Sequence, residues 1–349
     1  MHFLIAWHGL PFYGAENLLH LRRSEVAGEF DVIATDDKGS IRGTKQDRDL
    51  SVQWIKREYP CSFYDLGVAI PDVLLKTSWC HPAFESLTDD VRRSGGHVVM
   101  MADNTFHWRF RKLLGPIYGR LFLEKRHKAV LVPGVCAKKY MRWFGFERDA
   151  IFEGLYCTNP DRFKGGNSKR KRKILYVGRF EPEKNVRTLV AAWRRYKQRD
   201  GYFQSLHLVG SGSESLTPEP VFGVSVSPWL SQREIASLMR EADVLVLPSR
   251  QEHWGVVLLE AALSGCVLMA TDRCGAAYDL ISDGRNGIRV SGHSEEALFL
   301  AFRDLEEILL NTMRKSEARV LSREYGMRFS VDRFVSMIEN LQQYLCCAE

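Results

Sequence analysis

The sequence predicts two α/β domains, each built on a parallel sheet with helices on both faces. The chain has 349 residues, of which 45% are apolar, and this is enough to form two hydrophobic cores. Short apolar runs alternate with helical stretches along the chain, and this alternation favours parallel sheets. A polar, basic stretch with two glycines at 164–172 separates two such series. The expected domains are therefore 1–163 and 173–327, joined by a linker.

The predicted strands are short runs of apolar, β-branched or aromatic residues. In chain order they are 2–7, 31–35, 97–102, 129–133, 173–177, 206–209, 244–248 and 267–271. A helix is expected from Asn185 to Tyr196, and another begins at Gly255. Ligands of such sheets bind beyond the carboxyl ends of the strands, where helix N-termini present unpaired N–H groups. The segments that follow strands are therefore the places where a site is expected.

The net charge of +6 is confined to the first half of the chain. Residues 1–170 contain 26 Lys and Arg against 20 Asp and Glu, whereas the remaining residues contain 23 of each. Between residues 104 and 142, ten basic residues accompany a single acid, Glu124. This distribution indicates an anionic partner for the first domain.

Cysteine usage and hydropathy indicate the compartment. The eight cysteines form no Cys-x-x-Cys pair, and no paired histidine spacing suggests zinc. Free thiols in a reducing compartment are expected, without a metal site. No apolar run is long enough to span a bilayer, and the opening stretch lacks the basic lead of a signal peptide. These features predict a cytoplasmic protein that does not span a membrane.

The strongest motif covers 248–262, after a predicted strand. Gly255 permits close backbone approach to a ligand, and the apolar helix that begins there aims its positive dipole end outward, as a diphosphate requires. Glu252 would face a sugar, and Glu260 would accept hydrogen bonds from ribose hydroxyls. The alternative is that Glu252 caps the helix and Glu260 makes an ordinary surface pair.

This motif belongs to a longer pattern in the second half of the chain. Its parts are Glu-x7-Glu from Glu252 to Glu260, Ser264-Gly265-Cys266-Val267, Thr271, Gly275, Asp283-Gly284-Arg285-Asn286-Gly287, the Gly178-Arg179 to Lys184 segment, Gly210-Ser211-Gly212 and a closing helix at 329–345. The pattern closely resembles family 4 glycosyltransferases of the GT-B fold. The first half of the chain resembles that family in outline only.

The resemblance implies two Rossmann-like domains that face each other across a cleft, with residues 328–349 returning to the N-terminal domain. The N-terminal domain would bind the acceptor, and the C-terminal domain would bind a nucleotide-diphosphate sugar, a UDP-sugar being favoured over a GDP-sugar. The implied reaction is hexosyl transfer with retention of anomeric configuration, without a metal or other cofactor. The acceptor would be a saccharide or a lipid-linked molecule in bacterial surface glycan assembly, such as lipopolysaccharide, O-antigen, capsule or exopolysaccharide.

The resemblance also assigns donor-binding residues. Arg179 and Lys184 would grip the diphosphate, because fixed cations and a helix N-terminus stabilise a departing phosphate. Otherwise they are solvated charges on a loop. Val256 and Val257 would donate backbone N–H groups to the same phosphates. The candidate catalytic residues are Glu252, Asp103, Arg179 and Lys184.

Further contacts with the donor are implied on either side of these residues. His253 and Trp254 would contact the sugar ring, although Trp254 alone is equally typical of a core aromatic. Gly178 and Gly210 would lie in turns beside the nucleotide. Gly210-Ser211-Gly212 also begins a dinucleotide fingerprint, but Ser215 stands where the third glycine is required, which disfavours an oxidoreductase.

The first domain departs from the family at two positions. Gly14 lies in a segment similar to the family's glycine-rich loop, which faces the donor phosphates and the acceptor, but Tyr13 replaces the first of two adjacent glycines. A simple strand-to-helix turn is the alternative for this loop. Asp103 stands where many relatives carry a histidine. Its carboxylate would orient the acceptor hydroxyl or stabilise positive charge on the sugar, or would cap a helix before Thr105.

Two histidines are alternative candidates for the role of Asp103. They are His81 and His107, although each is more typical of a structural histidine. The basic segment 106–128 predicts an amphipathic helix that lies on an anionic membrane surface, at the inner face of the membrane, or packs on the sheet with a solvated basic side. Its apolar face would contain Phe110, Leu113, Leu114, Ile117, Tyr118, Leu121 and Phe122.

Two other classes of protein compete with an enzyme. The departures at Tyr13 and Asp103 keep open a protein of the same fold that binds a nucleotide sugar or an anionic glycan without turnover. A nucleic-acid-binding module is disfavoured, because the aromatic residues of the basic segment follow an amphipathic stripe rather than a binding platform.

Overall fold

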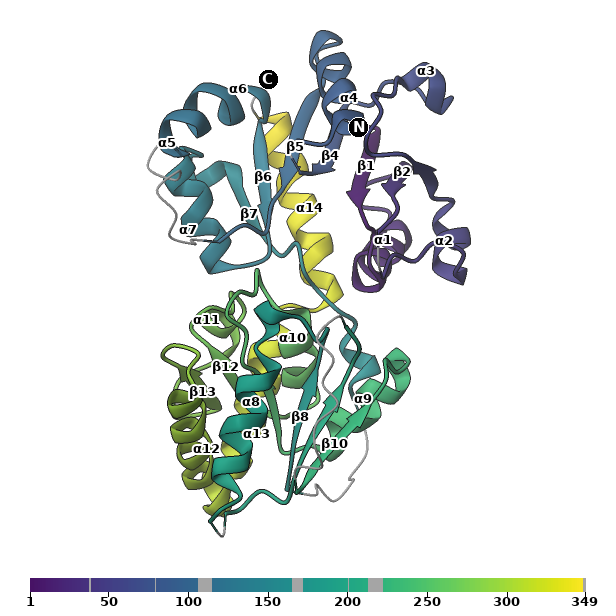
Figure 1. The fold of residues 1–349 in the computed structure, drawn as a ribbon. Helices are drawn as coiled ribbons and strands as arrows, with labels where there is room; N and C mark the ends of the chain where they lie inside the picture. The colour runs from purple at the N-terminus through teal and green to yellow at the C-terminus, as the bar shows by residue number, and fades with distance from the viewer. Residues whose placement is uncertain are drawn as a thin grey trace. The chain divides into compact units, whose positions relative to one another are not determined.

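The computed structural model describes residues 1–37, 39–78, 80–105, 115–164, 172–199, 201–212 and 222–347. The chain divides into two compact units (Figure 1). Unit 1 consists of Met1–Thr158 and Phe329–Glu349, and unit 2 consists of Asn159–Arg328. His107 and the first part of the predicted basic helix lie outside the described residues, as does most of the predicted linker.

Unit 1 is built on a seven-stranded parallel sheet with the order β3-β2-β1-β4-β5-β6-β7. Its central strands are buried on both faces, as expected of a sheet covered by helices. The strands are β1 (Phe3–His8), β2 (Phe30–Thr35), β3 (Gln53–Ile55), β4 (Val73–Thr77), β5 (His97–Met101), β6 (Ala129–Val132) and β7 (Ile151–Glu153).

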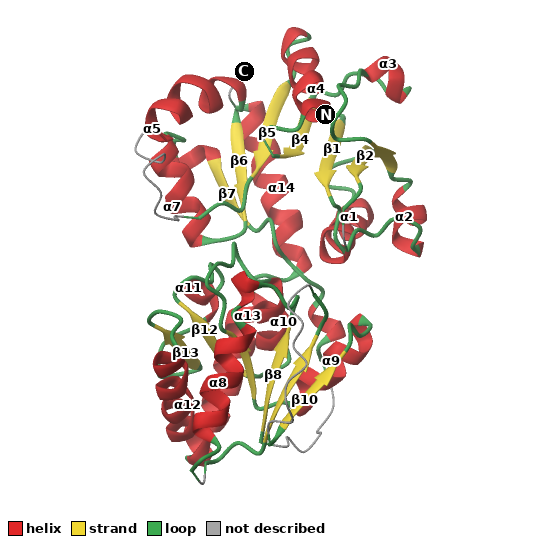
Figure 2. Ribbon diagram, in the orientation of Figure 1, coloured by secondary structure: helices red, strands yellow, loops and turns green. Residues whose placement is uncertain are grey.

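Helices flank the sheet of unit 1 (Figure 2). They are α1 (Phe12–Ser24), α2 (Lys45–Leu50), α3 (Phe63–Leu66), α4 (Pro82–Arg93), α5 (Gly115–Tyr118), the π-helical turn η2 (Gly119–Leu123), α6 (Glu124–Arg126), α7 (Val135–Phe144) and the 3₁₀ turn η3 (Arg148–Ala150). The last helix, α14 (Val331–Cys346), buries Phe334, Ile338 and Leu341 against α1 and β7. The closing helix therefore belongs to the N-terminal unit, as the expected fold requires.

Unit 2 is built on a six-stranded parallel sheet with the order β10-β9-β8-β11-β12-β13. The strands are β8 (Lys173–Val177), β9 (Ser205–Val209), β10 (Val224–Ser227), β11 (Val244–Leu247), β12 (Val267–Thr271) and β13 (Gly287–Val290). The helices are η4 (Pro160–Arg162), η5 (Pro182–Lys184), α8 (Val186–Tyr196), α9 (Gln232–Glu241), α10 (Val256–Leu263), α11 (Ala277–Leu280), α12 (Glu295–Leu310) and α13 (Thr312–Met327).

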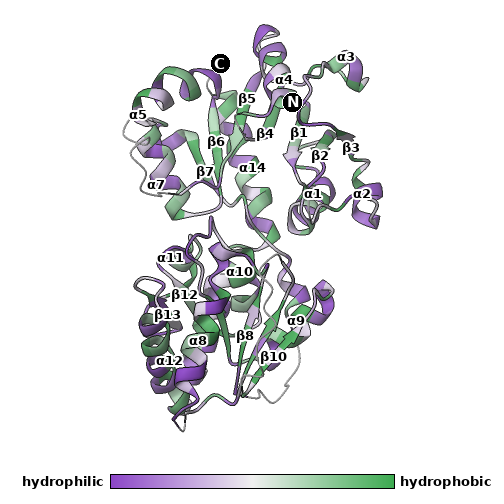
Figure 3. Ribbon diagram, viewed as in Figure 1, coloured by the Kyte–Doolittle hydropathy of each residue, from purple (hydrophilic) through white to green (hydrophobic). Residues whose placement is uncertain are grey.

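The predicted fold class is confirmed, and all eight predicted strands are present within one residue at either end. Figure 3 shows this pattern in β6, which reads Ala-Val-Leu-Val and is coloured as hydrophobic. The predicted helices after Asn185 and Gly255 are α8 and α10. Five further strands, β3, β4, β7, β10 and β13, were not predicted.

Candidate active site

Lys184 and Glu252 form an ion pair at the carboxyl ends of two neighbouring strands of unit 2. Lys184 ends the turn that follows β8, and Glu252 lies in the loop after β11. The Lys184 ammonium donates to Oε2 of Glu252 at 2.7 Å, and the two side chains are only 16% and 17% exposed. Two of the predicted catalytic residues, 68 positions apart in the sequence, therefore meet in one partly buried place. Because Glu252 pairs with Lys184, the alternative that it caps α10 is not what the structure shows.

Asn185 holds the two loops that carry this pair. It is buried, with a left-handed backbone at φ 60°. Its Nδ2 donates to the carbonyls of Pro248 at 3.0 Å and His293 at 2.9 Å, and its Oδ1 accepts from Arg250 Nε at 3.0 Å. Sequence analysis missed this role, although an asparagine directly before a helix is a residue that tolerates positive φ. These hydrogen bonds fix the positions of the loop after β8 and the loop after β11 relative to each other.

The N-terminus of α10 lies beside Glu252. Gly255 precedes the helix with φ 100°, and a Cβ there would lie 3.2 Å from Cγ of Glu252. The first N–H groups of a helix have no intrahelical acceptor, and Val256 and Val257 are partly exposed at this tip. Glu260 lies further along the helix and is buried. The helix tip, the ammonium and the carboxylate are thus close together.

Arg179 lies on the same β8 turn, but its ion pair is with a different acid. Its guanidinium contacts Oε1 of Glu181 at 3.1 Å, and the side chain is exposed. The hydroxyl of the buried Tyr176 donates to the Arg179 carbonyl at 2.8 Å, which fixes the backbone of the turn. The structure therefore places Arg179 near the strand end without pairing it to Glu252.

Gly178 and Gly210 allow two neighbouring turns to touch. A Cβ on Gly210 would lie 1.9 Å from the Gly178 carbonyl oxygen, a distance that no side chain tolerates. Gly210 also has φ 152°, and its N–H donates to the Ser227 carbonyl at 3.0 Å. Gly210 is therefore required by backbone packing at the carboxyl ends of β8 and β9, whereas a Cβ on Gly178 would lie 2.7 Å from the Tyr176 hydroxyl.

Trp254 requires a correction. Its side chain is 2% exposed, and its indole N–H donates to Oδ2 of Asp279 at 3.0 Å. An indole that is buried and bonded in this way is a core residue, so the expected contact of its ring with a sugar is wrong. The neighbouring His253 is partly buried, and its carbonyl would lie 2.2 Å from a Cβ on Gly275.

A cavity of about 460 Å³ lies in unit 1 at the carboxyl ends of β1, β4 and β5. Its lining includes His8, His81, Tyr13, Asp103 and Tyr156. The Tyr156 hydroxyl donates to Oδ2 of Asp103 at 2.8 Å, and the rings of Tyr13 and Tyr156 meet edge to face at 5.1 Å. Asp103 thus faces the position where open α/β sheets bind ligands.

The two histidines of this cavity are neutral at neutral pH. Their rings meet at 4.5 Å, nearly perpendicular to each other. Burial is the main cause that lowers the pKa of both His8 and His81, and the positive charge of Arg57 lowers both further, whereas Asp37 opposes the shift at His8. Gly14 lies in the first turn of α1 and packs against Leu10 and Trp7, where a Cβ would find only 3.1 Å.

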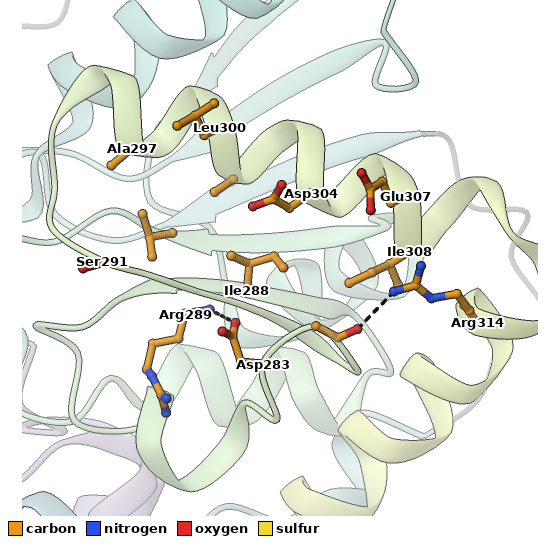
Figure 4. A pocket seen from close by; sticks show the side chains of 13 residues that line it. Asp283, Ile288, Arg289, Ser291, Ala297, Leu300, Asp304, Glu307, Ile308 and Arg314 are labelled. Carbon is orange, nitrogen blue, oxygen red and sulfur yellow. Dashed lines mark hydrogen bonds between the residues drawn. The ribbon is translucent and has the colours of Figure 1, made fainter.

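A second cavity, of about 510 Å³, runs along the edge strand β13 against α12 (Figure 4). The carboxylate of Asp283 accepts the Arg289 N–H at 2.8 Å, and the guanidinium of Arg314 donates to the Gly284 carbonyl at 3.4 Å. None of the predicted site residues lines this cavity. We therefore do not assign the donor site to it.

The described part of the basic segment exposes its apolar face. The exposed fractions are 57% for Ile117, 44% for Tyr118, 51% for Leu121 and 55% for Phe122. The opposite face packs on α7 through Gly115 and Gly119, whose Cβ positions would clash with Trp143 and Phe144. Gly115, Gly119 and Leu123 thus face the protein, whereas Ile117, Tyr118, Leu121 and Phe122 face solvent.

No group of three or more His, Cys, Asp or Glu side chains within the described residues is arranged to hold a metal ion. None of their helices is long and apolar enough to cross a bilayer. All eight cysteines are unpaired.

Part of the chain is similar to known glycosyltransferases. Residues 158–319 match the family model "Glycosyl transferases group 1". A D-inositol 3-phosphate glycosyltransferase of Paenarthrobacter aurescens is 34% identical over 186 residues, which are 50% of this chain and 42% of that protein. A glycogen synthase of Mycobacterium tuberculosis is 28% identical over 153 residues, 42% of this chain and 36% of that protein. The chain spans about two fifths of the length of such curated relatives.

Solved structures show that the fold is GT-B. Anabaena HepE in complex with UDP superposes with a TM-score of 0.76 at 14% identity, covering 99% of this chain and 100% of that one. A glycosyltransferase from Rickettsia africae gives 0.73 at 16% identity, covering 98% and 97%. WaaG, a glycosyltransferase of lipopolysaccharide biosynthesis, gives 0.62 at 16% identity, covering 98% and 99%.

Proposed function

We propose that the chain is a retaining, metal-independent glycosyltransferase that moves a hexose from a nucleotide-diphosphate sugar to an acceptor. The observation that carries the proposal is the Lys184–Glu252 pair at the N-terminus of α10. A helix N-terminus and an ammonium group stabilise the negative charge that a departing diphosphate gains. Glu252 provides a carboxylate beside that position to bind the sugar. The match to glycosyl transferases group 1 over residues 158–319 supports the same reaction class.

We assign the other predicted donor-binding residues by their places around the Lys184–Glu252 pair. Arg179 joins Lys184 on the diphosphate, because its exposed side chain can leave Glu181 for a stronger anion. Val256 and Val257 donate N–H groups to the same phosphates, Glu260 binds ribose, and Gly178, Gly210 and His253 border the donor. A UDP-sugar is the favoured donor, and HepE, a structural neighbour of the same fold, binds UDP.

The reaction is a displacement on the face from which the nucleotide leaves. The acceptor oxygen forms a bond to the anomeric carbon while the bond from that carbon to the phosphate oxygen breaks. The nucleoside diphosphate leaves with the electron pair of the broken bond. The proton of the acceptor hydroxyl passes to the departing phosphate. No metal is needed, since Arg179, Lys184 and the helix tip supply the positive charge.

A thermal-shift screen with nucleoside diphosphates and their sugars tests this proposal. A ligand at about 100 times its dissociation constant stabilises the folded state by about 2.7 kcal/mol, which raises Tm by roughly 5–10 °C. UDP or UDP-glucose is expected to give this shift, and Arg179→Ala is expected to reduce it. The exposed Arg194 on α8 offers the matched control Arg194→Ala, which keeps the shift. Absence of a shift with every nucleotide contradicts the proposal, and binding without turnover favours the non-catalytic alternative.

We further propose that the acceptor is a saccharide or lipid-linked molecule at the inner face of a bacterial membrane, within surface glycan assembly. The apolar side chains of Ile117, Tyr118, Leu121 and Phe122 are exposed together, and exposed basic residues at Arg120 and Lys125 accompany them. Aromatic and aliphatic side chains with adjacent cations bind the interface of an anionic bilayer. WaaG, which has the same fold, acts in lipopolysaccharide biosynthesis.

Vesicle sedimentation tests the membrane surface. The protein is expected to bind vesicles that contain phosphatidylglycerol, and the double variant Leu121→Glu with Phe122→Glu is expected to lower the partition coefficient by roughly ten- to hundredfold. Leu310→Glu with Met313→Glu introduces the same charges at exposed apolar residues of unit 2 and serves as the control. Equal binding by both double variants would show that this face does not contact lipid.

A further inference from the structure

The two departures of the first domain from the family pattern are connected in space. Tyr13 and Asp103 are 90 positions apart, yet both contact Tyr156, which follows β7. The Tyr156 hydroxyl donates to Oδ2 of Asp103 at 2.8 Å, and its ring meets that of Tyr13 at 5.1 Å. All three residues line the 460 Å³ cavity of unit 1. One substitution relative to the family pattern is therefore physically tied to the other.

The protonation state of Tyr156 determines that its hydroxyl is the donor in the hydrogen bond to Asp103. Burial raises the pKa of Tyr156 well above its ordinary value, and the charge of Asp103 and the interaction with Tyr13 raise it further. The phenol is therefore protonated, and its single proton is donated to Asp103. Hydrogen bonds to a charged acceptor are about twice as strong as those between neutral groups. Tyr156 thus fixes the orientation of the Asp103 carboxylate.

We propose that Asp103 orients the acceptor hydroxyl in this cavity and that Tyr156, supported by Tyr13, is the positioning residue for its carboxylate. The inference rests on the proposed glycosyltransferase function. Oδ2 of Asp103 is held by Tyr156, and Oδ1 accepts the hydrogen bond of an acceptor hydroxyl. This assigns Asp103 to the acceptor rather than to positive charge on the donor sugar.

The rest of the cavity indicates the chemical class of the acceptor. His8 and His81 are neutral, and Nδ1 of His81 is buried without a hydrogen-bond partner among the described residues. A neutral imidazole, phenols and a carboxylate exchange hydrogen bonds with hydroxyl groups. Arg57 places a positive charge near the two histidines, but the acceptor hydroxyl binds at Asp103, whose carboxylate repels an anion. The group that enters this cavity is therefore the ring of an uncharged sugar, not a phosphorylated one.

The experiment compares transfer with hydrolysis of the donor, using the nucleotide sugar that gives the thermal shift. The acceptors are methyl hexopyranosides and the corresponding sugar phosphates. Tyr156→Phe is expected to raise the KM for the glycoside about tenfold, with the dissociation constant of the donor unchanged. Asp103→Asn is expected to lower kcat/KM for transfer about a hundredfold while hydrolysis in the absence of acceptor stays within about threefold. Tyr344→Phe, a partly buried tyrosine on α14, is the matched control.

A double-mutant cycle separates positioning from a purely structural role. If Tyr156 acts through Asp103, the double variant is no worse than Asp103→Asn alone. Additive losses in the cycle overturn the positioning role. An equal loss of donor hydrolysis in Asp103→Asn overturns the acceptor assignment, and so does failure of every uncharged glycoside to accept the sugar. A wild-type protein that binds no nucleotide contradicts the proposed function instead, so the two failures are distinguishable.

Discussion

Lys184→Ala is expected to lower kcat by roughly 10²–10³-fold, the effect that follows loss of one preorganised group that stabilises developing negative charge. The variant also leaves the partly buried Glu252 without its cation, so that its charge repels the diphosphate. Steady-state kinetics with the donor identified by thermal shift measure the effect.

Two further variants show whether the loss at Lys184 is specific. Glu252→Gln keeps the size of the side chain but removes its charge, and a comparable fall in kcat is expected. Lys197→Ala removes a lysine whose ammonium donates to the Phe203 carbonyl and lies over the rings of Trp193 and Phe222, and it is expected to retain kcat. If Lys184→Ala stays within about threefold of the wild type, the assignment of this lysine to the leaving group is refuted.

Trp254→Ala is expected to destabilise unit 2 by about 3–5 kcal/mol, because truncation of a buried aromatic leaves a cavity. Unfolding in urea, followed by the change in tryptophan fluorescence, measures this loss. Trp229→Ala removes an exposed tryptophan of the same unit and is expected to cost less than about 0.5 kcal/mol.

The same position distinguishes packing from sugar binding. Trp254→Phe retains most of the buried ring but loses the hydrogen bond to Asp279. Its donor KM is expected to remain within about threefold of the wild type, because the side chain does not reach the ligand. A tenfold rise in donor KM in a stable Trp254→Phe protein would restore the sugar contact that the structure excludes.

The strands that sequence reasoning missed have features that interrupt an apolar run. β4 contains Lys76, a fully buried lysine that pairs with Glu85 on α4. A charged residue within an apolar run disfavours the prediction of a buried strand, because the acid that neutralises its charge is not adjacent in the sequence. β10 reads as alternating valine and serine at the edge of its sheet, and β3 and β7 have only three residues each. Short edge strands carry too little pattern to be predicted.

Some residues of the candidate site could likewise be assigned from the sequence, and others could not. Lys184, Glu252 and Gly255 could be placed because each follows a strand, and the carboxyl ends of parallel strands meet at one edge of a sheet. Asn185 and Tyr156 could not be assigned, since their partners are distant in the sequence: 108 positions separate Asn185 from His293. Trp254 was misassigned because an aromatic residue beside a glycine is equally typical of a ligand contact and of a core position.

Helix α14 comes last in the chain but belongs to unit 1. Its position therefore determines which of the two cores can be completed first during synthesis. Unit 2 is one uninterrupted segment, whereas unit 1 needs both Met1–Thr158 and the chain from Phe329 onward. The apolar side chains of Phe334, Ile338 and Leu341 fill space beside α1 and β7 that nothing earlier in the chain supplies. Unit 1, although translated first, is thus completed last, after unit 2 has all of its residues outside the ribosome.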